Sequence, residues 1–159
     1  MTYKVEVLAA HHRLTEFTSG APELDQWLAG PARQSNDRDT ARVYVICNGE
    51  GVVVAYSALV AATLSRESLR SRAASGLPQN VPAVLLAKLA VDQSNGASGL
   101  GTALLSHAIH TALQVREMIG ARLLFAEARD QSARDWYVAK GMDCASDDRT
   151  CYARLKDLV

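Results

Sequence analysis

The sequence has few cysteines and no long apolar stretch. Its three cysteines, Cys47, Cys144 and Cys151, form no C-x-x-C pair, and no histidine lies at ligand spacing from them, so we expect neither a disulfide framework nor a metal site. We interpret them as small buried apolar residues. No segment approaches the roughly 20 consecutive apolar residues that span a bilayer. The first residues also lack the apolar core of a signal peptide. These absences predict no membrane segment and a cytoplasmic location.

The sequence also lacks an excess of charge of either sign. Lys and Arg together number 17, and so do Asp and Glu, which gives a net charge of zero. Such a chain has no overall field that attracts nucleic acid or a membrane, although local basic patches can still act. Apolar residues make up 48% of the chain, and no repeat or long linker interrupts it. We therefore expect a single domain over residues 1–159.

Apolar periodicity and turn residues predict a mixed α/β order. The expected strands cover residues 3–8, 42–47, 52–60, 83–91, 123–128 and 150–155, and the expected helices are one capped by Ser19 and ending at Gly30, a second reaching Arg38, a short one at 65–72, and those at 100–119 and 131–140. The Asn48-Gly49 turn between two apolar runs is typical of a hairpin. Strand–helix–strand crossovers are expected in the C-terminal half.

A glycine-containing loop joins the strand that ends at Val91 to the long amphipathic helix. The loop includes Gly96, Gly99 and Gly101. Glycine permits close backbone approach, and the N-terminus of a helix presents N–H groups and a positive dipole end to anions. The loop therefore suits a pyrophosphate. It is not a P-loop, because no Gly-Lys-Ser/Thr follows, and its spacing does not fit a dinucleotide fingerprint.

Two motifs resemble the GNAT superfamily of N-acetyltransferases. Residues 96–101, Gly-Ala-Ser-Gly-Leu-Gly, resemble the family's Arg/Gln-x-x-Gly-x-Gly/Ala loop, with Gly96 where Arg or Gln is usual. Residues 132–142 resemble the family's Asn-x-x-Ala-x-x-Phe-Tyr-x-x-x-Gly-Phe helix, with Ser132 near the usual Asn. The resemblance implies a GNAT fold: a mixed, mostly antiparallel central sheet, splayed at the cofactor site and flanked by helices. It implies acetyl-CoA as co-substrate, bound by Leu89, Val91, Gly96, Ala97, Ser98, Gly99, Leu100, Gly101, Thr102 and Ser132.

A closer resemblance, to the GNAT toxins of toxin–antitoxin pairs, covers nearly the whole chain. Residues 17–28 look like the opening of these toxins, Lys88-Leu89-Ala90-Val91-Asp92 resembles their Arg-Leu-Ala-Val-Asp, and residues 114–120 follow their pattern. The resemblance implies acetylation of the α-amino group of an aminoacyl-tRNA. It also implies neutralisation by a ribbon-helix-helix antitoxin, and it suggests a homodimer.

Two residues are candidates for catalysis under this resemblance. Tyr137 would protonate the departing CoA thiolate, and the backbone N–H of Val91 would polarise the thioester carbonyl. Neighbouring residues on a helix point about 100° apart, so Tyr137 and Trp136 cannot be equally buried, and we expect Trp136 to be the core residue. No general base stands out, because Asp92 and Glu127 at strand ends can simply cap or pair. An α-amino group has a pKa of about 7.7–8.0 and needs no dedicated base.

Because the net charge is zero, tRNA binding must rely on local basic residues. The candidates are Arg70, Arg72, Lys88 and Arg134. Two alternatives stay open. An acetyltransferase acting on a small-molecule or protein amine is favoured by the neutral charge. A catalytically weak GNAT-fold binding module is favoured by Gly96 and Ala97, which depart from the family pattern.

Overall fold

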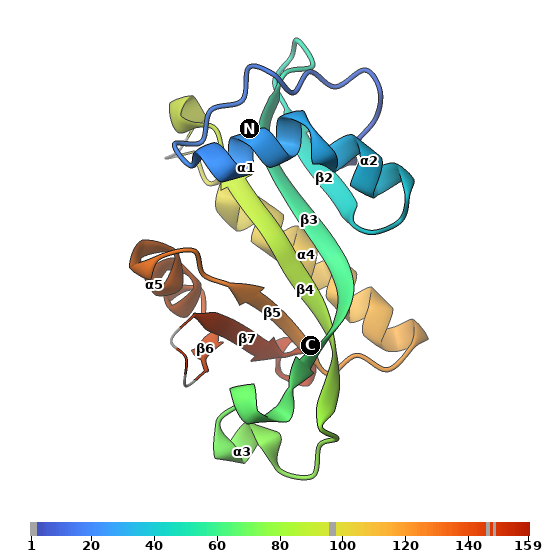
Figure 1. The fold of residues 1–159 in the computed structure, drawn as a ribbon, viewed down its shortest axis with the longest axis vertical. Coiled ribbons are helices and arrows are strands. Elements are labelled where there is room, and N and C mark those ends of the chain that lie inside the picture. Colours follow the sequence, from blue (N-terminus) through green and yellow to red (C-terminus); the bar gives the residue numbers. More distant parts are fainter. Residues whose placement is uncertain (1–2, 96–97, 146, 148) are drawn as a thin grey trace. The chain divides into compact units, whose positions relative to one another are not determined.

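A computed structural model of the chain describes residues 3–95, 98–145, 147 and 149–159 (Figure 1). The elements run in the order β1 (Glu6–Val7), α1 (Pro22–Ala29), α2 (Pro31–Asp37), β2 (Arg42–Cys47), β3 (Val53–Ser65), η1 (Arg66–Ser68), α3 (Ser71–Ala74), β4 (Asn80–Val91), η2 (Gln93–Asn95), α4 (Leu100–Met118), β5 (Leu123–Glu127), α5 (Gln131–Ala139), β6 (Asp143–Cys144), β7 (Thr150–Arg154) and η3 (Leu155–Leu158). Among the described residues, no helix is both long and apolar enough to cross a membrane.

The strands form a seven-stranded sheet in the order β1-β2-β3-β4-β5-β7-β6. β4 and β5 pair in parallel, whereas β1–β2, β2–β3, β5–β7 and β6–β7 pair antiparallel. The mixed, mostly antiparallel sheet with helices confirms the predicted fold class. The parallel pairing follows from the crossover through α4, since parallel neighbours need a long connection.

The chain divides into two compact units: residues 1–60 with 87–108, and residues 61–86 with 109–159. β3, β4 and α4 each contribute residues to both units. The expectation of one domain over residues 1–159 stays a prediction.

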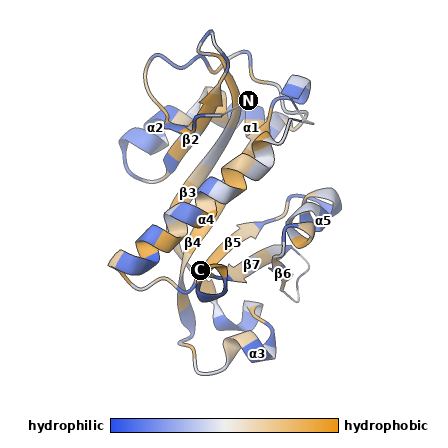
Figure 2. Cartoon of the chain, turned by 180° about the vertical axis from the view of Figure 1, so that it is seen from behind, coloured by the Kyte–Doolittle hydropathy of each residue, from blue (hydrophilic) through white to orange (hydrophobic). Residues whose placement is uncertain are grey.

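The first unit has apolar residues on both faces of its strands. Leu28 of α1 and Ala32 of α2 pack with Val43 and Tyr56, which belong to β2 and β3. Leu100, Leu104, Ile46 and Ala55 form a second cluster beneath the beginning of α4. Figure 1 shows α1 and α2 on the near side of β2 and β3, and Figure 2 shows α4 on the opposite side. Helices therefore cover both faces of these strands.

The second unit has its own core, around β5 and β7. Leu123 and Phe125 pack with Tyr152, Val81 and Leu69. The β4–β5 ladder runs from Ala83–Leu123 to Leu86–Ala126, although β4 continues to Val91. The pairing of β4 with β5 therefore stops five residues before β4 ends.

The structure differs from the predicted elements at long strands and at several short segments. β3 runs to Ser65 instead of ending at Val60, and the helix expected at 65–72 is replaced by η1 and α3. β1 covers two residues instead of six, and the two-residue strand β6 was not predicted. Helix α1 begins at Pro22 and has no side-chain cap. The Ser19 hydroxyl instead donates to Asp25 Oδ1 at 2.6 Å. Ser19 therefore orients the chain before the helix, but it does not cap the helix.

Candidate functional site

The loop after β4 begins in the first unit. Leu89 and Val91 are half-buried and pack against the cluster formed by Leu100, Leu104, Ile46 and Ala55. The strand and the beginning of α4 therefore share one apolar cluster, as expected for a strand–loop–helix unit. Gly96 and Ala97, two of the predicted cofactor-binding residues, lie outside the described residues.

Asp92 holds this loop to the segment before α1. Its Oδ2 accepts the Thr18 N–H at 2.9 Å, and its Oδ1 accepts the Ser94 N–H at 3.0 Å and the Ser94 hydroxyl at 2.7 Å. Burial opposes ionisation, but the hydrogen bonds from Ser94 and Thr18 outweigh it and lower the pKa of Asp92. An engaged, ionised carboxylate is a weak base, so Asp92 is an anchor of the loop.

A second contact brings Gly20 close to the same loop. The Gln93 N–H donates to Thr18 O at 2.8 Å. Gly20 has φ +91°, and a Cβ built on it would lie 2.6 Å from Gln93 Nε2. A glycine at this position therefore permits both the backbone conformation and the close approach.

The first turn of α4 supplies the backbone N–H groups that suit an anion. The first N–H groups of a helix have no partner inside the helix, and here they belong to Leu100, Gly101 and Thr102. Leu100 is 1% exposed, and its side chain packs in the apolar cluster with Leu104, Ile46 and Ala55. Gly99 has φ +82°, and among the described residues no atom lies within 4 Å of the place that a Cβ would take there. The Ser98 N–H donates to Asn95 O at 3.1 Å, so among the described residues the backbone N–H groups that suit an anion are those of Gly99 to Thr102.

The backbone of Val91 faces the edge of β4 that is remote from β3. The Asp92 N–H donates to Val54 O of β3 at 2.8 Å. Successive N–H groups of an extended strand point to opposite edges, so the Val91 N–H points to the other edge. This orientation leaves the N–H directed away from the β3 ladder, as an oxyanion donor requires.

A cavity of about 700 Å³ adjoins the same loop within the first unit. Lys4, Cys47, Asp92, Asn95 and Leu100 are among the residues that line it. It lies between the N-terminal segment, the β2–β3 turn and the beginning of α4. The loop therefore has open space beside it.

Helix α5 carries Tyr137 in the second unit. The helix begins after Asp130, whose Oδ1 accepts the Ala133 N–H at 2.8 Å, and Ser132 lies exposed in its first turn. Tyr137 is 7% exposed. Burial, with a smaller contribution from Cys151, raises the pKa of the Tyr137 phenol. At neutral pH the phenol is therefore protonated, and it is a weaker acid than an exposed tyrosine.

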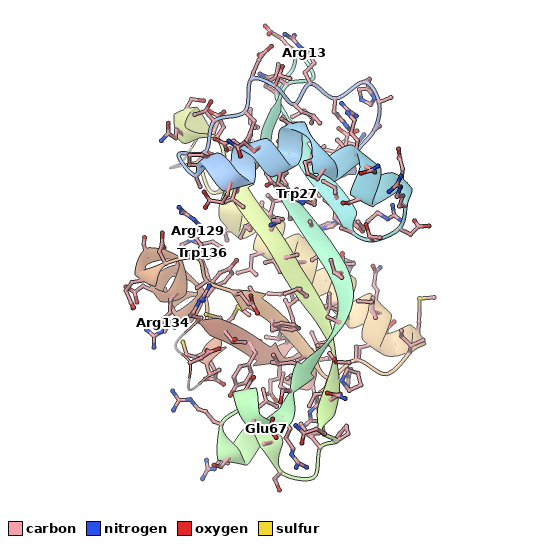
Figure 3. All side chains as sticks on the ribbon, viewed as in Figure 1. Arg13, Trp27, Glu67, Arg129, Arg134 and Trp136 are labelled. Carbon is pink, nitrogen blue, oxygen red and sulfur yellow. The ribbon has the colours of Figure 1, made fainter. Side chains whose placement is uncertain are left out.

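Trp136 and Tyr137 reverse the predicted order of burial. Tyr137 is buried, whereas Trp136 is only half-buried and packs edge-on to the Tyr137 ring at 5.1 Å between centroids. Lys140 Nζ lies 5.4 Å from the centre of the Trp136 ring (Figure 3 labels Trp136). The expectation that Trp136 is the core residue is therefore wrong. Helical spacing shows that the two side chains diverge, but it does not show which one faces the sheet.

The predicted tRNA-binding residues of the second unit differ in how firmly they are held. Arg70 Nε donates to Cys144 O at 3.1 Å, and its backbone N–H donates to the Tyr152 hydroxyl oxygen at 3.1 Å. These two hydrogen bonds hold the guanidinium of Arg70 in place, although the residue is exposed. Arg72 is exposed on α3, and Arg134 is half-buried on α5.

Lys88, the fourth predicted basic residue, lies in the first unit on an aromatic stack. Its Nζ is 5.5 Å from the centre of the Trp27 ring, and Trp27 stacks on Tyr56 with 6.0 Å between centroids. The Tyr56 hydroxyl donates to Leu24 O at 2.7 Å. Trp27 projects from α1 toward the strands (Figure 3). The sequence predicted that Trp27 lies on the apolar face of this helix. Its contact with Lys88 could not be predicted, because the two residues are 61 positions apart and no local pattern connects them.

Glu6, His11 and His12 are the described residues whose side chains come close enough to suggest a metal site. Their ligand atoms lie within 4.8 Å of one another. The buried His12 accepts the Ala9 N–H at Nδ1 over 2.9 Å, which leaves the proton of the neutral ring on Nε2. A protonated nitrogen is not a ligand, so this geometry does not favour a metal. The expected absence of a metal stays a prediction.

Comparisons with known proteins agree with this geometry. No family model matches the chain. The tRNA-acetylating toxin of Mycobacterium tuberculosis (strain ATCC 25618 / H37Rv) is 34% identical over 125 residues, which are 79% of this chain and 75% of that protein. A crystal structure of a mutant of KacT superposes with a TM-score of 0.93 at 22% identity, covering 99% and 98% of the two chains. A crystal structure of AtaTR bound with acetyl-CoA gives 0.84 at 25% identity, covering 98% and 95%.

The sheet order, the strand–loop–helix unit after β4 and the tyrosine on α5 define a GNAT-type acetyltransferase fold. Its sequence similarity to a characterised toxin is high enough, over enough of both chains, to fix the family. The chain belongs to the family of the tRNA-acetylating toxins.

Proposed function

We propose that this protein transfers the acetyl group of acetyl-CoA to the α-amino group of an aminoacyl-tRNA and thereby blocks translation. The observation that carries the proposal is the 34% identity to the tRNA-acetylating toxin over 79% of the chain. The structure of AtaTR bound with acetyl-CoA, at 25% identity, supports acetyl-CoA as the co-substrate.

The pyrophosphate of acetyl-CoA is proposed to lie on the backbone N–H groups of Gly99, Leu100, Gly101 and Thr102. Gly99 with its positive φ, and the N–H groups of the first turn of α4, suit an anion there. Gly96, Ala97, Ser98 and Ser132 remain proposed contacts on the strength of the family motifs. Leu89 and Val91 supply the strand edge that leads to the loop.

Transfer is direct and needs no acyl-enzyme. The neutral α-amine attacks the thioester carbonyl, the carbon–nitrogen bond forms, the carbon–sulfur bond breaks, and the departing sulfur takes a proton from Tyr137. The nitrogen releases one proton to water, and water returns one proton to the Tyr137 phenolate, so the amine proton is transferred overall to the CoA thiol. The Val91 N–H stabilises the oxyanion. Because an α-amine with a pKa of about 7.7–8.0 is partly neutral at cellular pH, the engaged carboxylate of Asp92 is not needed as a base.

The negatively charged phosphates of tRNA require contacts with basic side chains. For these contacts we propose Arg70, Arg72, Lys88 and Arg134. The fixed guanidinium of Arg70 and the ammonium of Lys88 on Trp27 support this choice, because a held cation loses less side-chain freedom on binding. We further propose a ribbon-helix-helix antitoxin, a homodimer and a cytoplasmic location, for which family membership is the support.

The direct test measures transfer of labelled acetyl from acetyl-CoA to charged and uncharged tRNA. Only charged tRNA presents a free α-amine, so only it should become labelled. Polyamines, free amino acids and a protein with a free N-terminus serve as competing acceptors. If one of these acceptors became labelled and charged tRNA did not, the protein would be an acetyltransferase of small-molecule or protein amines. The zero net charge favours that alternative. If the protein bound acetyl-CoA but transferred acetyl to none of these amines, it would be a binding module and not an enzyme.

A further inference from the structure

Two of the three cysteines face each other in the second unit. Cys144 of β6 and Cys151 of β7 are directly opposed partners in the antiparallel ladder. Cys144 is 5% exposed and Cys151 is 0% exposed, and both are free thiols. Cys47 lies on β2 in the first unit and is not part of this pair.

The ladder places the pair at the spacing that a disulfide needs. The Ala145 N–H donates to Thr150 O at 2.8 Å, which makes residues 145 and 150 a hydrogen-bonded pair. Pairs alternate along an antiparallel ladder, so Cys144 and Cys151 form a non-hydrogen-bonded pair, with Cα atoms about 4.5 Å apart. Disulfides span Cα separations of roughly 4.4–6.8 Å. A bond between the two sulfurs therefore needs little backbone movement.

The pair lies among residues to which the proposed function gives a role. The carbonyl of Cys144 accepts the hydrogen bond from Arg70 Nε. Cys151 lies near enough to Tyr137 to contribute to the raised pKa of the phenol. Arg134 also acts on Cys151, lowering its pKa against the dominant effect of burial. A change at the two sulfurs therefore reaches the proposed proton donor and a proposed tRNA contact.

We propose that Cys144 and Cys151 are a redox modification site, at which a reversible disulfide lowers acetyl transfer. With hydrogen peroxide as oxidant, Cys144 sulfur attacks one oxygen, the O–O bond breaks, and Cys144 sulfenic acid and water form. Cys151 sulfur then attacks the Cys144 sulfur, the S–S bond forms, the S–O bond breaks, and the thiol proton leaves with hydroxide as a second water. Two electrons pass from the thiols to the peroxide. A small dithiol reverses the reaction by exchange.

The burial of the two residues sets the order of these steps. Cys144 is the more exposed, so the oxidant reaches it first. Burial, together with the Cys144 thiol, raises the pKa of Cys151, so Cys151 holds little thiolate and is not the first sulfur to be oxidised. Its attack in the second step is made possible by its position directly opposite Cys144. Bonded sulfurs lie about 2.0 Å apart, well inside van der Waals contact, so oxidation draws Cys151 toward Cys144 and alters the packing beside Tyr137. This functional effect rests on the proposed role of Tyr137.

Peptide mapping tests bond formation independently of activity. Trypsin cleaves after Lys140, Arg149 and Arg154, so Cys144 and Cys151 fall in the adjacent peptides 141–149 and 150–154, and Cys47 falls in 43–66. After peroxide treatment of the full-length protein, we expect peptides 141–149 and 150–154 to be joined and two hydrogen atoms lighter than their sum. Dithiothreitol should separate them. Free peptides, or a bond that includes peptide 43–66, would overturn the proposal.

Activity tests the switch. The reduced protein is first assayed on charged tRNA, which tests the proposed function alone; if it acetylates another amine instead, that amine is used. Oxidation should lower the rate by roughly 10-fold to 10²-fold, the range that follows from small misplacements near a reacting centre, and dithiothreitol should restore it. The Cys47→Ala variant should respond like the wild type. Cys144→Ala and Cys151→Ala should resist oxidation, and either one suffices if the other does not fold. A mapped disulfide with an unchanged rate would overturn the switch.

Discussion

The Asp92 carboxylate joins the loop after β4 to Thr18, whose N–H it accepts at 2.9 Å across 74 residues of sequence. The same carboxylate holds Ser94 through its other oxygen. The segment that precedes α1 and the loop that precedes α4 therefore depend on one side chain. This relationship leads to the first prediction.

Replacing Asp92 with Ala should lower the free energy of unfolding by about 1.5 kcal/mol, at the low end for hydrogen bonds to a charged group, since the site is partly exposed. The folded-state pKa lies below the ordinary value of 3.8. The contribution is therefore complete above pH 3.8 and disappears as the pH falls through the lower folded-state value. Urea unfolding between pH 7 and pH 3 measures both effects. An equal pH dependence in the variant and the wild type would contradict the anchoring role.

Replacing Tyr137 with Phe removes one hydroxyl and keeps the ring in its buried position. If Tyr137 donates the proton to sulfur, the rate should fall by roughly 10²–10⁴-fold while acetyl-CoA binding persists. Single-turnover transfer and calorimetric binding measure the two quantities. Tyr44→Phe is the matched control, because Tyr44 packs against His107 in the other unit. Wild-type turnover in Tyr137→Phe would show that Tyr137 only packs.

Replacing Gly99 with Val should abolish coenzyme A binding. The substitution strains a residue at φ +82° and places a branched side chain in space that a phosphate would occupy. Gly76→Val is the control, since Gly76 has φ +76° and equally open surroundings in the β3–β4 connection. Both variants should lose some stability, but only Gly99→Val should lose binding in a titration monitored by calorimetry. If Gly99→Val and Gly76→Val bound coenzyme A equally well, the pyrophosphate would not lie on this loop.

His12 should make the protein less stable in mild acid. Burial, assisted by His11, lowers the pKa of His12 below 6.5, although Glu6 opposes the shift. The unfolded chain therefore binds a proton more readily, so stability is complete above pH 6.5 and declines as the pH falls toward the folded-state pKa. The slope approaches at most about 1.4 kcal/mol per pH unit. His12→Asn should flatten the dependence of the unfolding free energy between pH 7 and pH 5, and an unchanged slope would exclude His12 as its source.

Replacing Arg70, Arg72, Lys88 and Arg134 together with Ala should weaken tRNA binding and reduce its dependence on salt. Each lost phosphate contact lowers the slope of log affinity against log salt by about 0.9 or less. Acetylation of a small amine should be unchanged. Arg13→Ala is the control, because Arg13 pairs with Glu16 on the surface (Figure 3 labels Arg13). A similar loss in this control would mean that binding reflects overall charge alone.

Periodicity and turn residues were sufficient to predict the bounds of four elements, but not those of the two longest strands: β3 ends at Ser65 instead of Val60, and β4 begins at Asn80 instead of Ala83. β2, α4, β5 and α5 begin where expected and end within a residue of the prediction, because glycines and a compact hairpin turn mark their limits. The two-residue strand β6 has no such pattern, since its pairing depends on β7. The sequence motifs were enough to identify candidate site residues, but contacts between residues far apart in the chain could not be predicted from them. The contact of Lys88 with Trp27 and the hydrogen bond from Thr18 to Asp92 arise only from tertiary packing.

The division of the chain into two discontinuous units has a consequence for synthesis on the ribosome. The unit that contains the loop after β4 ends at residue 108, whereas the unit that contains Tyr137 needs residues up to 159. Domains emerge and fold from the N-terminus during translation, and the parallel β4–β5 ladder cannot form before β5 has been made. We expect a nascent chain to complete the unit that contains the loop after β4 before it completes the unit that contains Tyr137. Under the proposed role of Tyr137, a nascent chain that lacks residues 109–159 would therefore not transfer acetyl.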